Sequence, residues 1–378
     1  IFNELDIEIN PRQLICDMPL AKQQLVEIAK AISKDPQILI LDEATSALGN
    51  ADVKLLFSLI KKIVDKGKTV LFISHRMDEI EEIADSATIF RDAKYITQFK
   101  MGTVSRKQII DWIAGRTLDE VFPERKSELP YETILEIKGL SLGRSLRDIN
   151  IKVKKGEILG VAGLQGHGQN EFLRALFGML PVDSGHISFL GKSLSLRSPR
   201  DAIKAGIVLV PEDRKTEGLL LSMSVGHNLS LMILKKICSG PFLNKSKEYS
   251  EVNRAIDLLN IKTSDIGQAT INLSGGNQQK IVIGKTLLTD AKLLLLADPT
   301  RGIDVGTKAE IYQLIRTLSE KGVTIMFLST ELNELVGMCD RVIVFKQGSI
   351  VAELSHKDLN EKAILNASFG IEEGVEQC

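Results

Sequence analysis

The fold is decided by the stretch ILILDEAT at residues 38–45, which recurs as LLLLADPT at residues 293–300. The lag is 255 residues, and it also carries Gln23-Gln24 onto Gln278-Gln279 without a gap. Repeats in solenoid proteins recur every ~20–50 residues, so a lag of this length indicates a repeated domain. We therefore expect two related domains along the chain.

The two copies have lost different residues. Side chains of the first copy are replaced in the second by smaller or shorter ones: Asp42, Glu43 and His75 against Ala297, Asp298 and Thr330. Conversely, the second copy has LSGGN at residues 273–277, where the first has MPLAK at residues 18–22. The losses are complementary, which is the main clue to mechanism.

Composition narrows the class of protein. The 48 basic and 49 acidic side chains nearly cancel, so nothing predicts a nucleic-acid partner held by bulk charge. No apolar run approaches the ~18 residues of a membrane helix, so any membrane role must come through a partner. The four cysteines have no metal-ligand spacing, which favours free thiols in a reducing cytoplasm.

Apolar runs alternate with helical patterns from Pro36 onward, which predicts a parallel sheet flanked by helices. A polar, proline-bounded segment at residues 122–130 interrupts this rhythm. We expect residues 1–98 to be the C-terminal part of a first domain, residues 99–130 a connector, and residues 131–378 a second domain.

A glycine-rich loop opens the second domain after an apolar strand at residues 158–162. Gly163 and Gly168 have the spacing of a phosphate loop, with a helix expected from about Glu171. Gln169 and Asn170 stand where a full loop has Lys and Ser or Thr, so phosphate binding should be weakened. On this loop alone, a plain turn between strand and helix is an equal alternative.

The equivalent loop of the first domain falls roughly 90 residues before Ile1 when the lag is subtracted. The chain also opens with Ile and not Met. We expect the first domain to be cut, with any phosphate loop of its own outside this chain.

The acids of the first copy follow a strand, where ligands bind at the sheet edge of open α/β folds. Asp42 is the candidate ligand of Mg²⁺, and Glu43 the candidate general base. A helix-start cap is the alternative. His75 ends the next strand and is a candidate contact of the γ-phosphate, although a lone His is more often structural.

The stretch LSGGNQQ at residues 273–279 precedes a helical pattern. Ser274 suits a helix N-cap, and Gly275 and Gly276 allow a ligand to approach the backbone closely. Free N–H groups at the helix start favour a phosphate, and an ordinary capped turn is the alternative. In the first copy Pro19 offers neither N–H nor hydroxyl.

The order of phosphate loop, Leu-Ser-Gly-Gly, acids and His-bearing strand resembles an ATP-binding cassette domain of the P-loop NTPase class. PEDRK at residues 211–215 and DPTRGIDVG at residues 298–306 narrow the resemblance. They are similar to the duplicated ATP-binding subunit of bacterial ABC importers of ribose, galactose or xylose. The resemblance covers essentially the whole chain and implies an α/β fold of two cassette domains in tandem, the first incomplete.

The resemblance also implies head-to-tail pairing, with each ATP between the acids of one domain and the Leu-Ser-Gly-Gly of the other. One composite site is then consensus-like, with catalytic Glu43 and His75, Asp42 on Mg²⁺, and Ser274, Gly275, Gly276 and Gln278 on the nucleotide. The other is degenerate, with nucleotide contacts from Gly163, Gly168, Gln169, Asn170 and Asp298.

The family implies a monosaccharide-transporting ATPase with ATP and Mg²⁺ as cofactors. Its partners would be transmembrane permease subunits and, through them, a sugar-binding protein, at the cytoplasmic face of the inner membrane. The stretch at residues 211–218, with Arg214, is expected to contact the permease. Two alternatives stay open: a soluble cassette ATPase outside transport, and an inert truncated product. The 378 residues alone are expected to be inactive.

Overall fold

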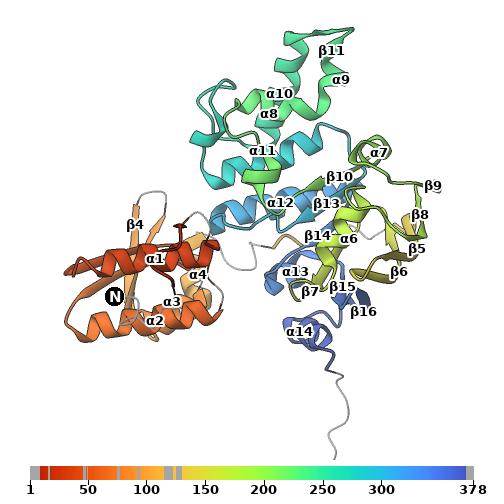
Figure 1. Cartoon of the computed structure of the whole chain (residues 1–378). Helices are drawn as coiled ribbons and strands as arrows, with labels where there is room; N and C mark the ends of the chain where they lie inside the picture. The colour runs from red at the N-terminus through yellow and green to blue at the C-terminus, as the bar shows by residue number, and fades with distance from the viewer. Residues whose placement is uncertain are drawn as a thin grey trace, which may run out of the picture. The chain divides into compact units, whose positions relative to one another are not determined.

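The computed structural model describes residues 9–15, 18–45, 48, 50–74, 77–91, 94–114, 122–124 and 130–371. His75, a predicted site residue, lies outside this range. The chain divides into two compact units, residues 1–118 and 119–378 (Figure 1). None of the described helices is long and apolar enough to cross a membrane.

The first unit alternates helices and strands, as the apolar pattern predicted. Its elements are α1 (Leu20–Ile32), β1 (Ile38–Asp42), α2 (Asn50–Asp65), β2 (Thr69–Ile73), α3 (Met77–Ile83), β3 (Ser86–Arg91), β4 (Lys94–Lys100) and α4 (Arg106–Ala114). Strands β1 and β2 pair in parallel, whereas β3 and β4 form a separate antiparallel pair. Gly67, with φ of +79°, turns the chain after α2.

The second unit is built on a central six-stranded sheet in the order β10-β13-β14-β7-β15-β16. Its strands are β7 (Ile158–Gly163), β10 (Ile207–Val210), β13 (Leu293–Ala297), β14 (Thr324–Leu328), β15 (Arg341–Lys346) and β16 (Ser349–Ser355). All neighbours pair in parallel except β15 and β16. Strand β7 lies inside the sheet and is buried on both faces, as its unbroken apolar run predicted.

A second, antiparallel sheet has the order β6-β5-β8-β9. It comprises β5 (Thr133–Leu142), β6 (Leu146–Lys154), β8 (Ser184–Phe189) and β9 (Lys192–Leu194). Figure 1 shows it beside α6 (Gln169–Leu176). Side chains of both sheets and of α6 share one core, which includes Leu140, Phe172 and Phe345.

The remaining helices fall into two groups. Near the central sheet are α7 (Pro199–Ala205), α12 (Val305–Glu320), α13 (Leu332–Met338) and α14 (Glu361–Phe369). The other group, at one end of the unit in Figure 1, comprises the π-helix η2 (Arg214–Gly218), α8 (Val225–Ser230), η3 (Leu231–Ile233), α9 (Leu234–Ile237), α10 (Lys245–Leu259), η4 (Thr270–Asn272) and α11 (Gly275–Leu287). A short hairpin, β11 (Cys238–Ser239) and β12 (Phe242–Leu243), interrupts this largely helical segment.

The element boundaries of the two units differ by the same 255 residues as the sequences. The matching pairs are α1 and α11, β1 and β13, α2 and α12, β2 and β14, α3 and α13, β3 and β15, β4 and β16, and α4 and α14. The parallel register agrees too, since Ile38 faces Thr69 and Leu293 faces Thr324. Even the irregularity at Ile89/Phe90 recurs at Val344/Phe345.

One face of the parallel pair in the first unit is bare. Ile38 and Ile40 of β1 are 60% and 62% exposed, and Leu71 of β2 is 52% exposed. Their counterparts in the second unit, Leu293, Leu295 and Met326, are fully buried in the core that includes α6. Among the described residues of the first unit, no strand pairs with the outer edge of β2, where the second unit has β7. Within the described residues, the first unit therefore presents a two-stranded parallel sheet with one uncovered apolar face.

We predict that this face tolerates charge in the 378-residue chain. Ile40→Lys should change the free energy of unfolding by less than about 1 kcal/mol, because the side chain is already in water. Leu39→Lys places a charge at a position that is 5% exposed and should unfold the first unit. Urea unfolding and binding of an apolar dye measure both effects. Equal destabilisation by the two variants would contradict the exposed face.

Candidate functional site

The glycine loop of the second unit joins β7 to α6 and has the shape of a phosphate loop. Gly168 has φ of +105°, and a Cβ there would lie 2.5 Å from the Ser145 carbonyl oxygen, so only glycine fits. Helix α6 begins at Gln169, two residues before the predicted start at Glu171. Because α6 begins at Gln169, both Gln169 and Asn170 lie in the first helical turn, where backbone N–H groups lack partners within the helix.

Gln169 closes the loop from inside. Its side-chain amide donates to the carbonyl oxygens of Gly163, at 3.2 Å, and Leu164, at 2.9 Å. The side chain is buried, and its Oε1 has no hydrogen-bond partner among the described residues. A phosphate offers acceptors only, so an amide oxygen cannot replace the ammonium of a lysine here. Gln169 shapes the loop but supplies no positive charge.

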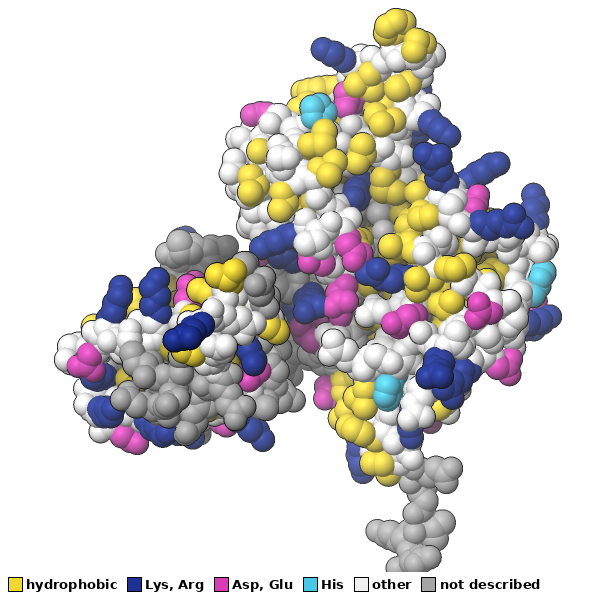
Figure 2. All heavy atoms as spheres, viewed as in Figure 1, with side chains coloured by type: hydrophobic (Ala, Val, Ile, Leu, Met, Phe, Trp, Pro, Cys, Tyr) yellow, Lys and Arg dark blue, Asp and Glu magenta, His cyan; other side chains and the backbone are white. Residues whose placement is uncertain are grey.

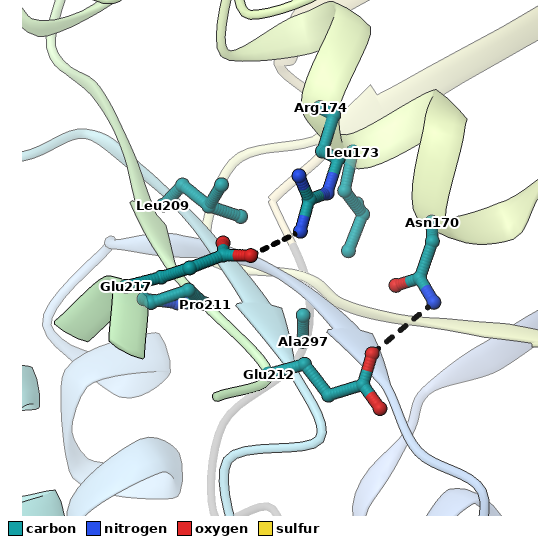
Figure 3. A pocket seen from close by; sticks show the side chains of 8 residues that line it. All are labelled: Asn170, Leu173, Arg174, Leu209, Pro211, Glu212, Glu217 and Ala297. Atoms are coloured by element: carbon teal, nitrogen blue, oxygen red, sulfur yellow. Dashed lines mark hydrogen bonds and ion pairs between the residues drawn. The ribbon is translucent and has the colours of Figure 1, made fainter. Parts of the chain in front are cut away.

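Asn170 turns toward an acidic neighbour. Its Nδ2 donates to Glu212 Oε2 at 3.4 Å, and Glu212 also forms an ion pair with Arg301. Figure 3 shows the Ala297 methyl group close to two interactions. One is the hydrogen bond between Asn170 and Glu212, and the other is the ion pair of Arg174 with Glu217. The cavity that these side chains line measures 10 Å³, room for about one water. With alanine at position 297 and Asn170 engaged, the residues present do not fit Mg²⁺.

Asp298 follows β13 and is 4% exposed. Its Oδ1 accepts hydrogen bonds from the backbone N–H of Thr330 at 2.7 Å and from the Thr330 hydroxyl at 3.1 Å. Burial, aided by the charges of Glu212 and Glu334, raises the pKa of Asp298 to about 6, although the Thr330 donors oppose this. The carboxyl group thus faces its own unit and not an open site.

The Leu-Ser-Gly-Gly stretch lies on the start of α11. The Ser274 hydroxyl caps the helix by accepting from the backbone N–H of Asn277, whose Nδ2 also donates to it at 3.0 Å. Ser274 lines an open hollow of 610 Å³ together with Lys262, Thr263, Ser264, Gln268, Asn272, Leu273 and Asn277. Within the part of the chain that the structure describes, the Ser274 hydroxyl is seen only as an acceptor, so it can still donate one hydrogen bond to a ligand.

Gln278, Gly275 and Gly276, which are close to Ser274 in the sequence, pack against other residues of the second unit. Gln278 is 5% exposed, and its amide donates to the Thr270 carbonyl oxygen at 3.2 Å, so it holds the stretch and does not line the hollow. A Cβ at Gly276 would lie 2.6 Å from the Thr307 side chain, and one at Gly275 would lie 2.7 Å from Arg214 Nη2. The two glycines thus allow close packing within the unit as well as ligand approach.

Arg214 is engaged inside the second unit, which departs from the expectation of an outward contact. Its Nη1 donates to the Arg301 carbonyl oxygen at 2.7 Å and its Nη2 to that of Gly302 at 3.1 Å. Burial lowers the pKa of the guanidinium, and its Nε has no partner among the described residues. The next residue of η2, Lys215, is exposed and is the better candidate for an outward contact.

In the first unit the acids lie where the sequence placed them, at the carboxyl end of β1. Asp42 and Glu43 are both exposed, and Glu43 has φ of +46°. The backbone N–H of Glu43 donates to the Ile73 carbonyl oxygen of β2 at 2.9 Å. An exposed carboxylate at a sheet edge is a donor that Mg²⁺ accepts, so Asp42 fits the expected cation.

Sequence reasoning missed three residues beside these acids. Glu79 is buried and accepts hydrogen bonds from Thr45 at 2.6 Å and Ser74 at 3.0 Å. The signal was available in the repeat, since Thr45, Ser74 and Glu79 recur as Thr300, Ser329 and Glu334.

Comparison with known proteins identifies the class. Residues 146–301 match the family model described as ABC transporter. An ATP-binding cassette of an ABC transporter in its ADP conformation superposes with a TM-score of 0.52 at 23% identity, covering 63% of this chain and 99% of that chain. A nucleotide-free cassette gives 0.53 at 23% identity, covering 64% and 100%. The structure therefore has the ATP-binding cassette fold, an α/β fold with mixed sheets.

Curated relatives give the family. Ribose import ATP-binding protein RbsA 1 of Rhizobium etli is 44% identical over 367 residues, which are 96% of this chain and 72% of that protein. A putative ribose/galactose/methyl galactoside import ATP-binding protein of Agrobacterium fabrum is 41% identical over 369 residues, 97% and 73% of the two chains. The chain belongs to the ABC ATP-binding subunits of ribose/galactose-type sugar importers.

We predict that Asp298 makes the second unit less stable as pH rises. Its pKa of about 6 exceeds the ordinary 3.8, so its stabilising contribution is complete below about pH 4 and is lost as pH rises through 6. Asp298→Asn keeps an acceptor for Thr330 without the charge. It should raise the free energy of unfolding at pH 8 by about 2–3 kcal/mol and change it little at pH 4. Urea unfolding at several pH values measures this, and an unchanged pH slope would contradict the burial argument.

Proposed function

We propose that this chain is the ATP-hydrolysing subunit of an importer that takes up a monosaccharide, and that its two ATP sites are unequal. The observation that carries the proposal is the different state of the acids in the two units. Asp42 and Glu43 are exposed at a sheet edge, whereas Ala297 cannot bind a metal and Asp298 is buried against Thr330. The exposed carboxylates of the first pair support a role at a nucleotide, whereas the second pair offers no exposed carboxylate.

The proposal includes two cassettes in tandem, with residues 1–98 the C-terminal part of the first, 99–130 a connector, and 131–378 the second. The common shift of the element boundaries supports the repeat. The bare face of β1 and β2 supports an incomplete first cassette, because the second unit covers that face with α6. Phe122 packs on Tyr312 with ring centroids 5.0 Å apart, so the end of the connector is anchored to the second unit.

In the consensus-like site, Glu43 would act as general base toward the water that attacks the γ-phosphate. Asp42 would hold Mg²⁺, which neutralises phosphate charge when bound. The Ser274 hydroxyl and the N–H groups at Gly275 and Gly276 would contact the γ-phosphate of the same ATP. The assignment of Glu43, Asp42 and Ser274 to one ATP rests on the family's head-to-tail pairing, as does the role of His75.

The remaining site is proposed to be degenerate. Gly163, Gly168 and Asn170 retain the shape of a phosphate loop, but Gln169 offers no charge and its amide is used on loop carbonyl oxygens. Asp298 has no open position for a water. We expect weak nucleotide binding and no hydrolysis at this site.

The partners would be permease subunits in the membrane and, through them, a sugar-binding protein outside. The subunit would lie on the cytoplasmic face of the inner membrane as a peripheral protein. The names of the relatives favour import over a soluble cassette ATPase, because each is called an import ATP-binding protein. The balance of 48 basic and 49 acidic residues gives no support for a nucleic-acid partner.

We predict unequal effects of the two acids on turnover. In the complete subunit assembled with its permease, Glu43→Gln should lower kcat by about 10²–10⁴, because the general base is lost. Asp298→Asn should leave kcat within about twofold, because that carboxyl group performs no chemistry in the proposal. Steady-state ATPase assays decide the matter: equal losses would refute the asymmetry. The 378 residues alone should show negligible turnover.

A second prediction concerns the permease contact. Lys215→Glu should weaken association with the permease by about three- to tenfold, since it reverses an exposed charge on η2. Lys357→Glu, at an exposed lysine after β16, is the matched control and should have no effect. Co-purification at graded salt measures both variants. Equal behaviour of the two would remove η2 from the proposed contact.

A further inference from the structure

A buried carboxylate ties together two loops of the first unit. Glu79, on α3, is 6% exposed. Its Oε2 accepts from the Thr45 hydroxyl at 2.6 Å and from the Ser74 hydroxyl at 3.0 Å. Thr45 follows Glu43 by two residues, and Ser74 directly precedes position 75. We call Thr45, Ser74 and Glu79 the carboxylate strap, since they join the loop after β1 to the loop after β2.

The same strap is present in the second unit. Glu334 accepts from the Thr300 hydroxyl at 2.7 Å and from the Ser329 hydroxyl at 2.6 Å. A backbone hydrogen bond of 2.9 Å lies beside each strap. The Glu43 N–H donates to the Ile73 carbonyl oxygen in the first unit, and the Asp298 N–H donates to the Leu328 carbonyl oxygen in the second. The geometry is therefore reproduced in two independent settings of the same fold.

The second unit shows what a strap does to the residues that it flanks. There the two loops are held so close that the Asp298 carboxylate accepts two hydrogen bonds from Thr330. Asp298 is the counterpart of Glu43, and Thr330 is the counterpart of position 75. We infer that a strap fixes the spacing between two loop positions. In the first unit these are Glu43, the proposed base, and position 75, which follows the neighbouring strand.

The strap of the second unit has two further donors at positions that cannot donate in the first. Glu334 also accepts from the Tyr312 hydroxyl at 2.5 Å and from the Lys308 ammonium at 3.0 Å. The counterparts of these residues in the first copy are Phe57 and Val53, neither of which can donate a hydrogen bond. The first unit therefore has no counterpart of these two donors.

We propose that the carboxylate strap is a positioning device for Glu43, which the proposed function makes the general base; the inference rests on that function. The strap fixes the backbone of residues 43–45, including the left-handed conformation of Glu43. A base that shifts by about 1 Å relative to its water can lose about 10²-fold in rate. Thr45, Ser74 and Glu79 act through Glu43 and do not touch the nucleotide.

The test compares Thr45→Val, Thr45→Ser and Thr300→Val in the complete subunit assembled with its permease. Thr45→Val keeps the shape of the side chain but loses the hydroxyl, and should lower kcat by about 10- to 100-fold with KM for ATP within about twofold. Thr45→Ser restores the donor and should return kcat to within about threefold of wild type. Thr300 is as buried as Thr45, at 2% exposed, so Thr300→Val is the matched control and should leave kcat nearly unchanged.

Three outcomes overturn the strap proposal: Thr45→Val as fast as wild type, Thr45→Ser as slow as Thr45→Val, or Thr300→Val as slow as Thr45→Val. If Thr45→Val does not fold, Ser74→Ala and its counterpart Ser329→Ala make the same comparison. Glu43→Gln measured in parallel separates the two proposals. If it keeps its turnover, the proposed function fails; if it loses turnover while Thr45→Val does not, only the strap fails.

Discussion

In both units, parallel pairing sets everything that follows at the site. Strands β1 and β2, and likewise β13 and β14, pair in the same register, so their carboxyl ends reach one edge together. The loops beyond this edge carry polar residues, and strand pairing alone does not fix the distance between the two loops. A buried glutamate in each unit accepts hydroxyl hydrogen bonds from both loops and holds them at a fixed spacing. An unpaired buried carboxylate costs several kcal/mol, so these hydroxyl donors also contribute to the stability of each unit.

The two units use this shared edge in different ways. In the first, Asp42 and Glu43 are exposed at the edge of a sheet that has one uncovered apolar face. In the second, the counterparts are an alanine and a buried aspartate whose hydrogen bonds are made within the unit. The edge of the first unit therefore carries exposed carboxylates beside an exposed apolar face. The same edge of the second unit carries a buried aspartate in a fully packed unit.

Much of this was predictable because it depends on periodicity and on the repeat. The lag of 255 residues carries every element of the first unit onto an element of the second, and the acids after residues 38–41 lie at the strand end as expected. The orientation of Gln169, Gln278 and Arg214 was not predictable from residue type, because each side chain donates to backbone carbonyl oxygens whose positions only the fold determines. Arg214, for example, binds carbonyl oxygens 87 and 88 residues further on. The start of α6 was two residues too late in the prediction, since a glycine at +105° can cap a helix without a polar side chain.

The amide of Gln169 has a consequence for the behaviour of the second unit over time. A phosphate loop with lysine must exchange partners whenever a nucleotide arrives or leaves. The glutamine of this loop donates to two carbonyl oxygens of the loop itself and carries no charge, so it offers a nucleotide no ammonium to bind. The phosphate loop of the second unit would then stay unchanged through each round of the cycle, and the timing of the cycle would be set at the consensus-like site alone.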